Sequence, residues 1–158
     1  MKKPKIYIET TMFNYYFDCE REAHLHTVKL FEELRSGRYE PYTSEYVLQE
    51  LRRAPEPKRG AMLRLIGDFE IAVFDVDAEA ERLADVYVAE KVLPEKYRMD
   101  GLHIALTAVK GLEFIVSLNF KHIVKRRTLL LTEVINTREG YRRVGIFSPM
   151  EVVEDDGE

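Results

Sequence analysis

The chain opens its first apolar run with Ile6-Tyr7-Ile8 and closes it with the polar residues Glu9-Thr10-Thr11. A second run, Phe114-Ile115-Val116-Ser117-Leu118, ends in the same way at Asn119. Short continuous apolar runs are typical of strands that are buried on both faces in a parallel sheet. Ligands of open α/β sheets gather beyond the carboxyl ends of such strands. We therefore expect Glu9 and Asn119 to meet at one edge of a sheet.

Strand and helix signals alternate along the whole chain. The expected strands are Lys5–Glu9, Tyr39–Thr43, Phe69–Phe74, Glu113–Leu118 and Val144–Phe147. The expected helices are Glu22–Arg35, Ser44–Arg53, Lys58–Ile66, Ala78–Lys91 and Gly101–Lys110. Repeated β-α units imply a mostly parallel sheet with helices on both faces. The sequence thus predicts an α/β fold with three layers, α/β/α.

Local signals indicate where several of these elements begin and end. Gly37 and Gly67 are expected helix stops, and Ser44 and Asp77 are expected N-caps. The helical periodicity of residues 78–91 is carried by Ala80, Leu83, Ala84, Tyr87 and Val88. The strand-like alternation of residues 69–74 is carried by Phe69, Ile71 and Val73.

The composition is that of a soluble globular protein, with 158 residues of which 46% are hydrophobic and 33% charged. We expect one domain over residues 1–153 and an acidic, disordered tail over residues 154–158. No apolar run approaches the roughly 20 residues of a membrane helix, and the N-terminus lacks the hydrophobic region of a signal peptide. Cys19 is the single cysteine, which excludes an internal disulfide and fits a reducing cytoplasm.

The net charge of −4 does not by itself exclude a polyanionic partner. The tail alone supplies four negative charges, from Glu154, Asp155, Asp156 and Glu158. Basic residues that could grip phosphates are Arg52, Arg53, Lys58, Arg59, Arg64, Lys121, Lys125, Arg126, Arg127, Arg138, Arg142 and Arg143. The alternative is that these residues are only the solvent-exposed charges of helix faces and bind no phosphate.

Two further acids stand in stretches expected to be helical. Glu50 lies within Ser44–Arg53, and Asp100 opens Gly101–Lys110. Together with Glu9 and Asn119 they give three carboxylates and an amide, which are hard oxygen ligands suited to Mg²⁺ or Mn²⁺. Zinc is not expected, because three of the four histidines, His24, His26 and His122, show no spacing typical of metal ligands.

Each of these site residues also has an interpretation without function. Glu9 would be the polar end of a strand, Asp100 the N-cap of its helix and Asn119 a turn residue. Glu45 and Glu50 flank the apolar stripe of their helix on opposite edges, so periodicity does not choose between them. His103, one turn after Asp100, could orient substrate, but we favour a place on the helix surface.

Four segments carry a family resemblance in their order along the chain. They are Tyr7-Ile8-Glu9-Thr10-Thr11, a Ser-x-x-x-x-x-Glu-Leu helix from Ser44, Met99-Asp100-Gly101-Leu102-His103-Ile104-Ala105-Leu106 and Ser117-Leu118-Asn119-Phe120-Lys121-His122-Ile123. The chain resembles the PIN domain family over nearly its whole length, and in particular the PIN-type, VapC-like toxins of toxin–antitoxin pairs. The resemblance implies a parallel sheet flanked by helices, metal-dependent ribonuclease activity and, as in many members, a homodimer.

Carried over by position, the resemblance makes Glu9, Glu50, Asp100 and Asn119 the catalytic cluster, which agrees with the candidates found from the residues themselves. Glu9, Glu50 and Asp100 are the expected ligands of Mg²⁺ or Mn²⁺. We expect the substrate-binding residues to be Thr10, Thr11 and Lys121.

The chain departs from the family pattern at two of these positions. The usual first acid is Asp, whereas Glu9 carries its carboxylate one methylene further out. The fourth site is often Asp, whereas Asn119 offers an oxygen without a charge. Both changes bear on metal affinity, because ligand charge is part of what holds a hard cation.

The sequence therefore predicts a Mg²⁺-dependent endoribonuclease that hydrolyses RNA phosphodiester bonds, with an antitoxin protein and a second copy of the chain as partners. The alternative is a catalytically weak or inactive PIN-like module that binds RNA or a protein, for which Asn119 is the main support. A third hypothesis is a metal-dependent phosphohydrolase that acts on DNA.

Overall fold

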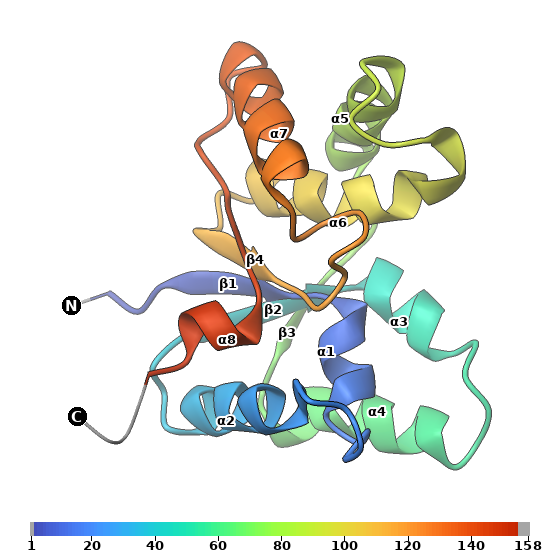
Figure 1. Ribbon diagram of the computed structural model, residues 1–158, viewed down its shortest axis with the longest axis vertical. Coiled ribbons are helices and arrows are strands. Elements are labelled where there is room, and N and C mark those ends of the chain that lie inside the picture. The colour runs from blue at the N-terminus through green and yellow to red at the C-terminus, as the bar shows by residue number, and fades with distance from the viewer. Residues whose placement is uncertain (1, 155–158) are drawn as a thin grey trace.

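The computed structural model describes residues 2–154, and its centre is a sheet of five parallel strands. The strand order is β3-β2-β1-β4-β5. The strands are β1 (Lys5–Ile8), β2 (Glu40–Ser44), β3 (Ala72–Phe74), β4 (Phe114–Val116) and β5 (Gly145–Phe147). Helices cover both faces of this sheet (Figure 1), which confirms the three-layer α/β/α prediction.

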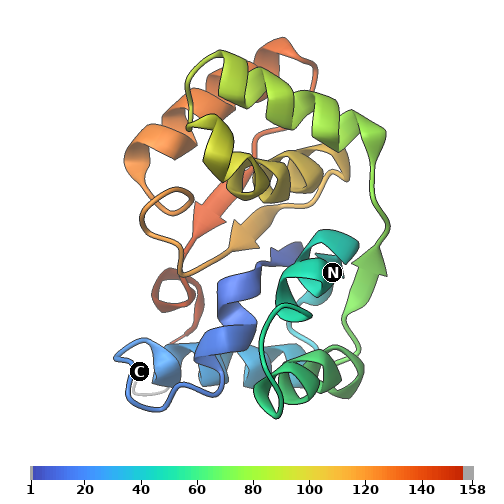
Figure 2. The same ribbon diagram turned by 90° about the vertical axis from the view of Figure 1, so that its right-hand side faces the viewer.

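The helices divide between the two faces of the sheet. Their bounds are α1 (Thr10–Tyr15), α2 (His24–Arg35), α3 (Glu45–Leu51), α4 (Lys58–Asp68), α5 (Ala78–Ala89), the 3₁₀ turn η1 (Glu95–Tyr97), α6 (Arg98–Val109), α7 (Arg126–Arg138) and α8 (Pro149–Val152). One face carries α5, α6 and α7, and the other carries α1, α2, α4 and α8 (Figure 1, Figure 2). Helix α3 continues directly from the end of β2.

The centre of the sheet is fully buried, as expected for a parallel sheet with helices on both sides. Ile6, Tyr7 and Ile8 of β1 have no exposed surface. Helix α6 is buried continuously from Gly101 to Ala108, which explains why it is apolar around its circumference rather than on one stripe. The site is therefore built on the most deeply buried strand and helix of the protein.

The topology places a switch point at β1. From β1 the chain adds β2 and then β3 on one side, and then adds β4 and β5 on the other side. The connections that leave β1 and β4 therefore diverge beyond the carboxyl ends of these strands, and such a crevice is where open α/β sheets bind ligands. Glu9 directly follows β1, and Ser117 directly follows β4.

The expected helix signals at three positions are confirmed. Gly37 follows the end of α2 with φ +82°, a left-handed conformation that glycine adopts readily. The Ser44 side chain accepts a hydrogen bond from Val47 N–H at the start of α3. The Asp77 side chain likewise accepts one from Ala80 N–H at the start of α5.

The segment from α4 to β3 differs from its prediction. Helix α4 continues through Gly67 instead of stopping there, and Phe69 is its C-cap rather than a strand residue. Phe69 and Ile71 are buried but Val73 is 41% exposed, so their alternation does not extend through β3. The reason is that β3 is an edge strand of three residues.

Three helices, α1, α7 and α8, were not expected from the sequence. Helix α7 is rich in β-branched residues, which weaken local helix signals. Its buried Thr128 and Thr132 hydroxyls are satisfied by the carbonyls of His122 and Thr128 respectively. Tertiary packing thus makes a helix of a segment whose local preference is weak.

The end of the described chain is held in place. Glu154 N–H donates to Glu33 Oε2 at 3.1 Å, and the Glu154 carboxylate pairs with Arg38 at 3.3 Å. The expected disordered tail otherwise lies outside the described residues. Across residues 2–154, none of the helices is long and apolar enough to span a membrane.

The Asp77 cap gives a stability prediction. Asp77→Ala removes the acceptor for Ala80 N–H, as well as the ion pair with Lys110 at 3.1 Å, and should lower the free energy of unfolding by about 1 kcal/mol. Asp77→Asn keeps a capping oxygen and should lose less. Urea denaturation of both variants measures this difference. Equal losses would show that the charge, not the cap, stabilises α5.

Candidate active site

Glu9 lies at the carboxyl end of β1 with its side chain 2% exposed. Its Oε1 accepts three hydrogen bonds, from Thr11 N–H at 3.1 Å, Thr11 Oγ1 at 2.5 Å and Ser117 Oγ at 2.6 Å. The first of these caps α1, so Glu9 is more than the polar end of a strand. The carboxylate is fixed in one orientation at the switch point.

The hydroxyls around Glu9 tie the ends of β1 and β4 together. Thr11 Oγ1 accepts from Leu118 N–H at 2.8 Å, and Ser117 Oγ accepts from Asn119 N–H at 2.9 Å. The Thr11 hydroxyl, expected to contact substrate, is therefore engaged with protein groups on both sides. Ser117 is a residue of the site that the sequence analysis did not identify.

Glu50 points into the same region from α3. Its Oε1 accepts from Thr10 Oγ1 at 2.6 Å and contacts His103 Nε2 at 2.7 Å. Glu45, on the opposite edge of the apolar stripe, instead pairs with the exposed Arg52 at 2.6 Å. The structure thus directs Glu50 toward Thr10 and His103 and pairs Glu45 with Arg52 on the same helix surface. The Thr10 hydroxyl, like that of Thr11, is bonded to an acid of the site.

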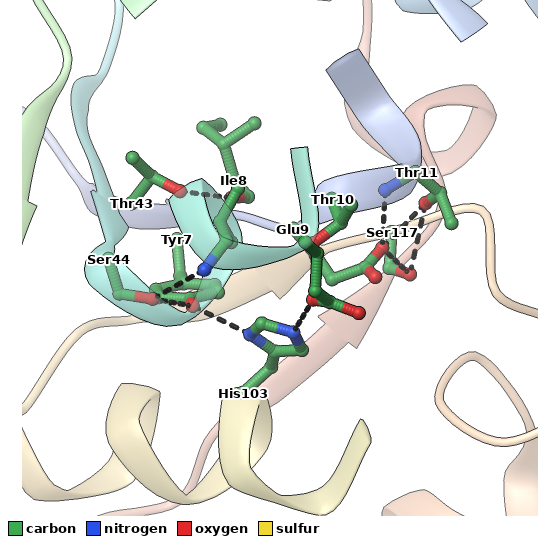
Figure 3. A network of polar contacts seen from close by, with 11 residues as sticks. Tyr7, Ile8, Glu9, Thr10, Thr11, Thr43, Ser44, His103 and Ser117 are labelled. Carbon is green, nitrogen blue, oxygen red and sulfur yellow. Dashed lines mark hydrogen bonds and ion pairs between the residues drawn. The ribbon is translucent and has the colours of Figure 1, made fainter. Parts of the chain in front are cut away.

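His103 is fully buried, so the interpretation as a helix-surface histidine is wrong. Its Nδ1 contacts the Tyr7 hydroxyl at 2.7 Å (Figure 3). Its Nε2 contacts Glu50 Oε1 at 2.7 Å, so both ring nitrogens have partners. The sequence offered one signal for this placement. His103 follows Asp100 by three residues in an apolar helix, and residues at that spacing share a helix face.

Asp100 lies inside α6 rather than at its start, which corrects the N-cap interpretation. The helix begins at Arg98 with Tyr97 at the N-cap, and that N-cap makes no side-chain cap bond. Asp100 is partly buried, and its electrostatic neighbours include His103 and Glu50. The aspartate therefore faces the other acids of the site.

Asn119 occupies the turn after β4. Its Oδ1 accepts from His122 N–H at 3.0 Å, and its side chain also hydrogen-bonds Asp100. Because the amide oxygen is taken by the turn, the amide nitrogen is the group left to donate to Asp100. Asn119 is therefore both the turn residue and a neighbour of the acids. In this arrangement its amide nitrogen acts as a donor toward Asp100, while its oxygen holds the turn.

His122 borders the site from the same turn. Its ring stacks on Tyr97 with centroids 3.8 Å apart, and its Nε2 is buried without a hydrogen-bond partner among the described residues. It is close enough to Asp100 to act on the pKa of that carboxyl. From its spacing in the sequence, His122 was not expected to bind zinc, and no other role was predicted for it.

Burial and the central imidazole set the ionisation of the acids in opposite directions. Burial raises the pKa of Glu9 and of Asp100 above their ordinary values, although His103 acts against this. Burial also acts to raise the pKa of Glu50, but hydrogen bonds from His103 and Thr10 hold it below its ordinary value. Burial acts to lower the pKa of His103, yet the bond to Glu50 and the nearby carboxylates raise it.

The donor set fits a hard cation in chemistry, but it is not arranged as a cage. Within residues 2–154, no group of three His, Cys, Asp or Glu side chains is placed so that it could hold a metal ion. All described hydrogen bonds to the side chains of Glu9 and Glu50 end at Oε1, which leaves Oε2 of each carboxylate for another partner. Carboxylates oriented in this way by protein donors are typical of metal sites.

Many of the basic residues expected to grip phosphates are engaged within the protein. Lys121, by contrast, is exposed on the loop that follows Asn119. The engaged residues are the following. Arg127 donates to the carbonyls of Val92 and Lys91. Ion pairs join Arg52 to Glu45, Arg59 to Glu56, Arg138 to Glu90 and Arg143 to Glu133.

Comparison with known proteins gives a likeness of fold. No protein-family model and no curated protein matches the chain. The crystal structure of Mycobacterium tuberculosis VapC20, a toxin that cleaves the sarcin–ricin loop, matches with a TM-score of 0.57 and 16% sequence identity. The match covers 88% of this chain and 98% of that one. The resemblance to the PIN-type toxins is thus confirmed at the level of the fold.

The raised pKa of Asp100 gives a prediction for the metal-free protein. A carboxyl whose pKa is raised on folding stabilises the fold below its unfolded pKa, and this stabilisation is lost as the pH rises through the folded pKa. Asp100→Asn removes the ionisable group, and with it the loss of stability on ionisation. With a chelator at pH 7, the variant should be at least as stable as wild type, and its stability should fall less between pH 4 and pH 7.

Chemical denaturation at the two pH values tests this expectation. The Asn side chain keeps an oxygen to accept from Asn119, so the neighbouring turn should be unaffected. A loss of about 2 kcal/mol at pH 7 would contradict it, because a loss of that size would show that the charged Asp100 carboxylate stabilises the fold through its hydrogen bonds.

Proposed function

We propose that this protein is a divalent-metal-dependent endoribonuclease and the toxin of a toxin–antitoxin pair. The observation that carries the proposal is the convergence of Glu9, Glu50 and Asp100 around one buried imidazole beside the β1–β4 switch point. The likeness of fold to VapC20, itself a toxin that cleaves the sarcin–ricin loop, supports the same class of activity.

Mg²⁺ or Mn²⁺ is the proposed cofactor, held by carboxylate oxygens of Glu9, Glu50 and Asp100. Such a cation supplies a water of lowered pKa and neutralises charge that develops on the phosphate. Glu9 and Asp100 gain most from it, because burial already disfavours their charged forms. Since the three acids do not form a ready cage, binding should draw them together.

The surrounding side chains would keep these acids oriented. Thr11 and Ser117 fix Glu9, and Thr10 fixes Glu50. The roles of Thr10 and Thr11 in binding substrate would therefore be indirect, through the acids that they hold. Lys121, exposed beside Asn119, is the proposed contact to an RNA phosphate.

A homodimer is part of the proposal, and α7 offers a surface for it. Leu130 and Val134 lie one turn apart on this helix and are 47% and 66% exposed. Apolar side chains at that spacing form one stripe on a helix. An antitoxin protein is the second proposed partner.

The second candidate function is an inactive PIN-like module that binds RNA or a protein. It is favoured by the lack of a preformed metal cage in the described residues and by the neutral Asn119 at the fourth position. Cleavage assays separate it from the nuclease, and single-stranded DNA as a second substrate tests the remaining hypothesis of a DNA-directed phosphohydrolase.

Glu50 and Glu45 provide a matched pair for the activity test. Both lie on α3, but only Glu50 reaches the acids, since Glu45 pairs with Arg52. Glu50→Gln should reduce Mg²⁺-dependent RNA cleavage by more than the roughly 10–100-fold that loss of an outer-shell partner costs, and Glu45→Gln should cleave like wild type. A chelator should abolish the wild-type activity.

Single-turnover cleavage of labelled RNA measures all three proteins. Cleavage that survives the chelator would contradict the metal proposal. Folded wild-type protein that binds RNA with Mg²⁺ present but does not cleave it would support the inactive module instead. Faster cleavage of single-stranded DNA than of RNA would support the hypothesis of a DNA-directed phosphohydrolase.

A further inference from the structure

A closed path of hydrogen bonds begins and ends on helix α3. Ser44, the N-cap of α3, contacts the Tyr7 hydroxyl at 2.6 Å, and this hydroxyl contacts His103 Nδ1 at 2.7 Å. His103 Nε2 then contacts Glu50 Oε1 at 2.7 Å, six residues along α3 from Ser44. Figure 3 shows the Tyr7 hydroxyl between Ser44 and His103. The path thus joins β1 and α6 to both ends of one short helix.

The donors and acceptors along this path can be assigned in one consistent direction. Ser44 Oγ accepts from Val47 N–H at 3.4 Å, so its own proton is available to Tyr7. Tyr7 then donates to His103 Nδ1, and His103 Nε2–H donates to Glu50. This is the tautomer of a neutral imidazole; in the imidazolium, which the raised pKa of His103 favours, Nδ1–H donates to Tyr7 and the bonds on that side reverse, while Nε2–H still donates to Glu50. Each polar group on the path is satisfied.

The part of the path from Ser44 to His103 is buried away from water, which restricts its side chains. Ser44, Tyr7 and His103 have no exposed surface, and a buried polar group that loses its partner costs about 1–3 kcal/mol. The imidazole cannot rotate without breaking its bonds to Tyr7 and Glu50 together. The Tyr7 and His103 rings also lie against each other, with centroids 5.6 Å apart. The orientation of Glu50 is therefore determined by groups that water does not reach.

We propose that Tyr7 and His103 are positioning residues for metal binding, an inference that rests on the proposed function. They hold Glu50 by Oε1 and so present Oε2 to the cation. Thr10 reinforces this by donating to the same oxygen. Tyr7 itself touches neither metal nor substrate and acts through His103. The residue type at position 7, inside a central strand, thereby sets the affinity of a site two side chains away.

Tyr7→Phe tests this inference with little change in shape, because it deletes one hydroxyl and keeps the ring. Tyr87→Phe is the matched control. Tyr87 is also fully buried, and its hydroxyl donates to Asn136 on α7, outside the path. Tyr7→Phe loses two buried hydrogen bonds, to Ser44 and His103, whereas Tyr87→Phe loses one, so both variants should lose thermal stability and Tyr7→Phe should lose more. Only Tyr7→Phe should weaken binding of Mn²⁺, by about 10-fold or more, in the range seen for outer-shell partners.

Mn²⁺ titration of the metal-free protein, followed by electron paramagnetic resonance, gives the affinity without any nuclease assay. Equal Mn²⁺ affinity in Tyr7→Phe and Tyr87→Phe would overturn the positioning role. Wild-type protein that binds no Mn²⁺, or binding that Glu50→Gln leaves unchanged, would overturn the proposed function itself. The two failures are thus distinguishable.

A second pair of variants keeps the test decisive if Tyr7→Phe does not fold. His103→Gln retains an amide N–H that can donate to Glu50, whereas His103→Leu retains no donor. We expect His103→Gln to bind Mn²⁺ more tightly than His103→Leu, and both to bind it more weakly than wild type. Affinities of both variants equal to the wild-type value would overturn the inference.

Discussion

The hydrogen bond between His103 and Glu50 is the interaction on which the rest of the site depends. It joins α6, which covers one face of the sheet, to α3, which continues from β2. It also brings the polar edge of an imidazole next to carboxylates that are otherwise removed from water. Isolated buried charges are costly, and a hydrogen-bonded partner offsets that cost. Glu9 and Asp100 lie within the field of the same ring.

The parallel topology explains why these residues meet. Because β4 is added beside β1 after the chain has built β2 and β3 on the other side, residues that are 108 positions apart come within one hydrogen bond, as Ser117 and Glu9 do at 2.6 Å. The same sheet carries Tyr7 beneath His103, so one strand supplies both a site acid and the support for another acid. The residues of β1 therefore contribute both to the core of the sheet and to the candidate site.

Sequence reasoning predicted the fold class correctly because the alternation of strands and helices depends on local pattern, and the positions of the acids at the ends of these elements made them candidates. It did not place His103, whose burial depends on the packing of α6 against α5 and the sheet rather than on its own neighbours in the sequence. Helical periodicity did not choose between Glu45 and Glu50 for the same kind of reason, and only the family resemblance selected Glu50. The helical wheel is symmetrical about them, and in the structure contacts with Thr10 and His103, 40 and 53 positions away along the chain, distinguish Glu50.

A crystal structure of the protein grown with Mn²⁺, using the anomalous signal of the metal, tests the central claim most directly. The account predicts one Mn²⁺ beyond the carboxyl ends of β1 and β4, in contact with oxygens of Glu9, Glu50 and Asp100, while Glu50 keeps its bond to His103. A Mn²⁺ bound elsewhere, no anomalous peak at all, or a Glu50 carboxylate turned away from His103 would contradict it.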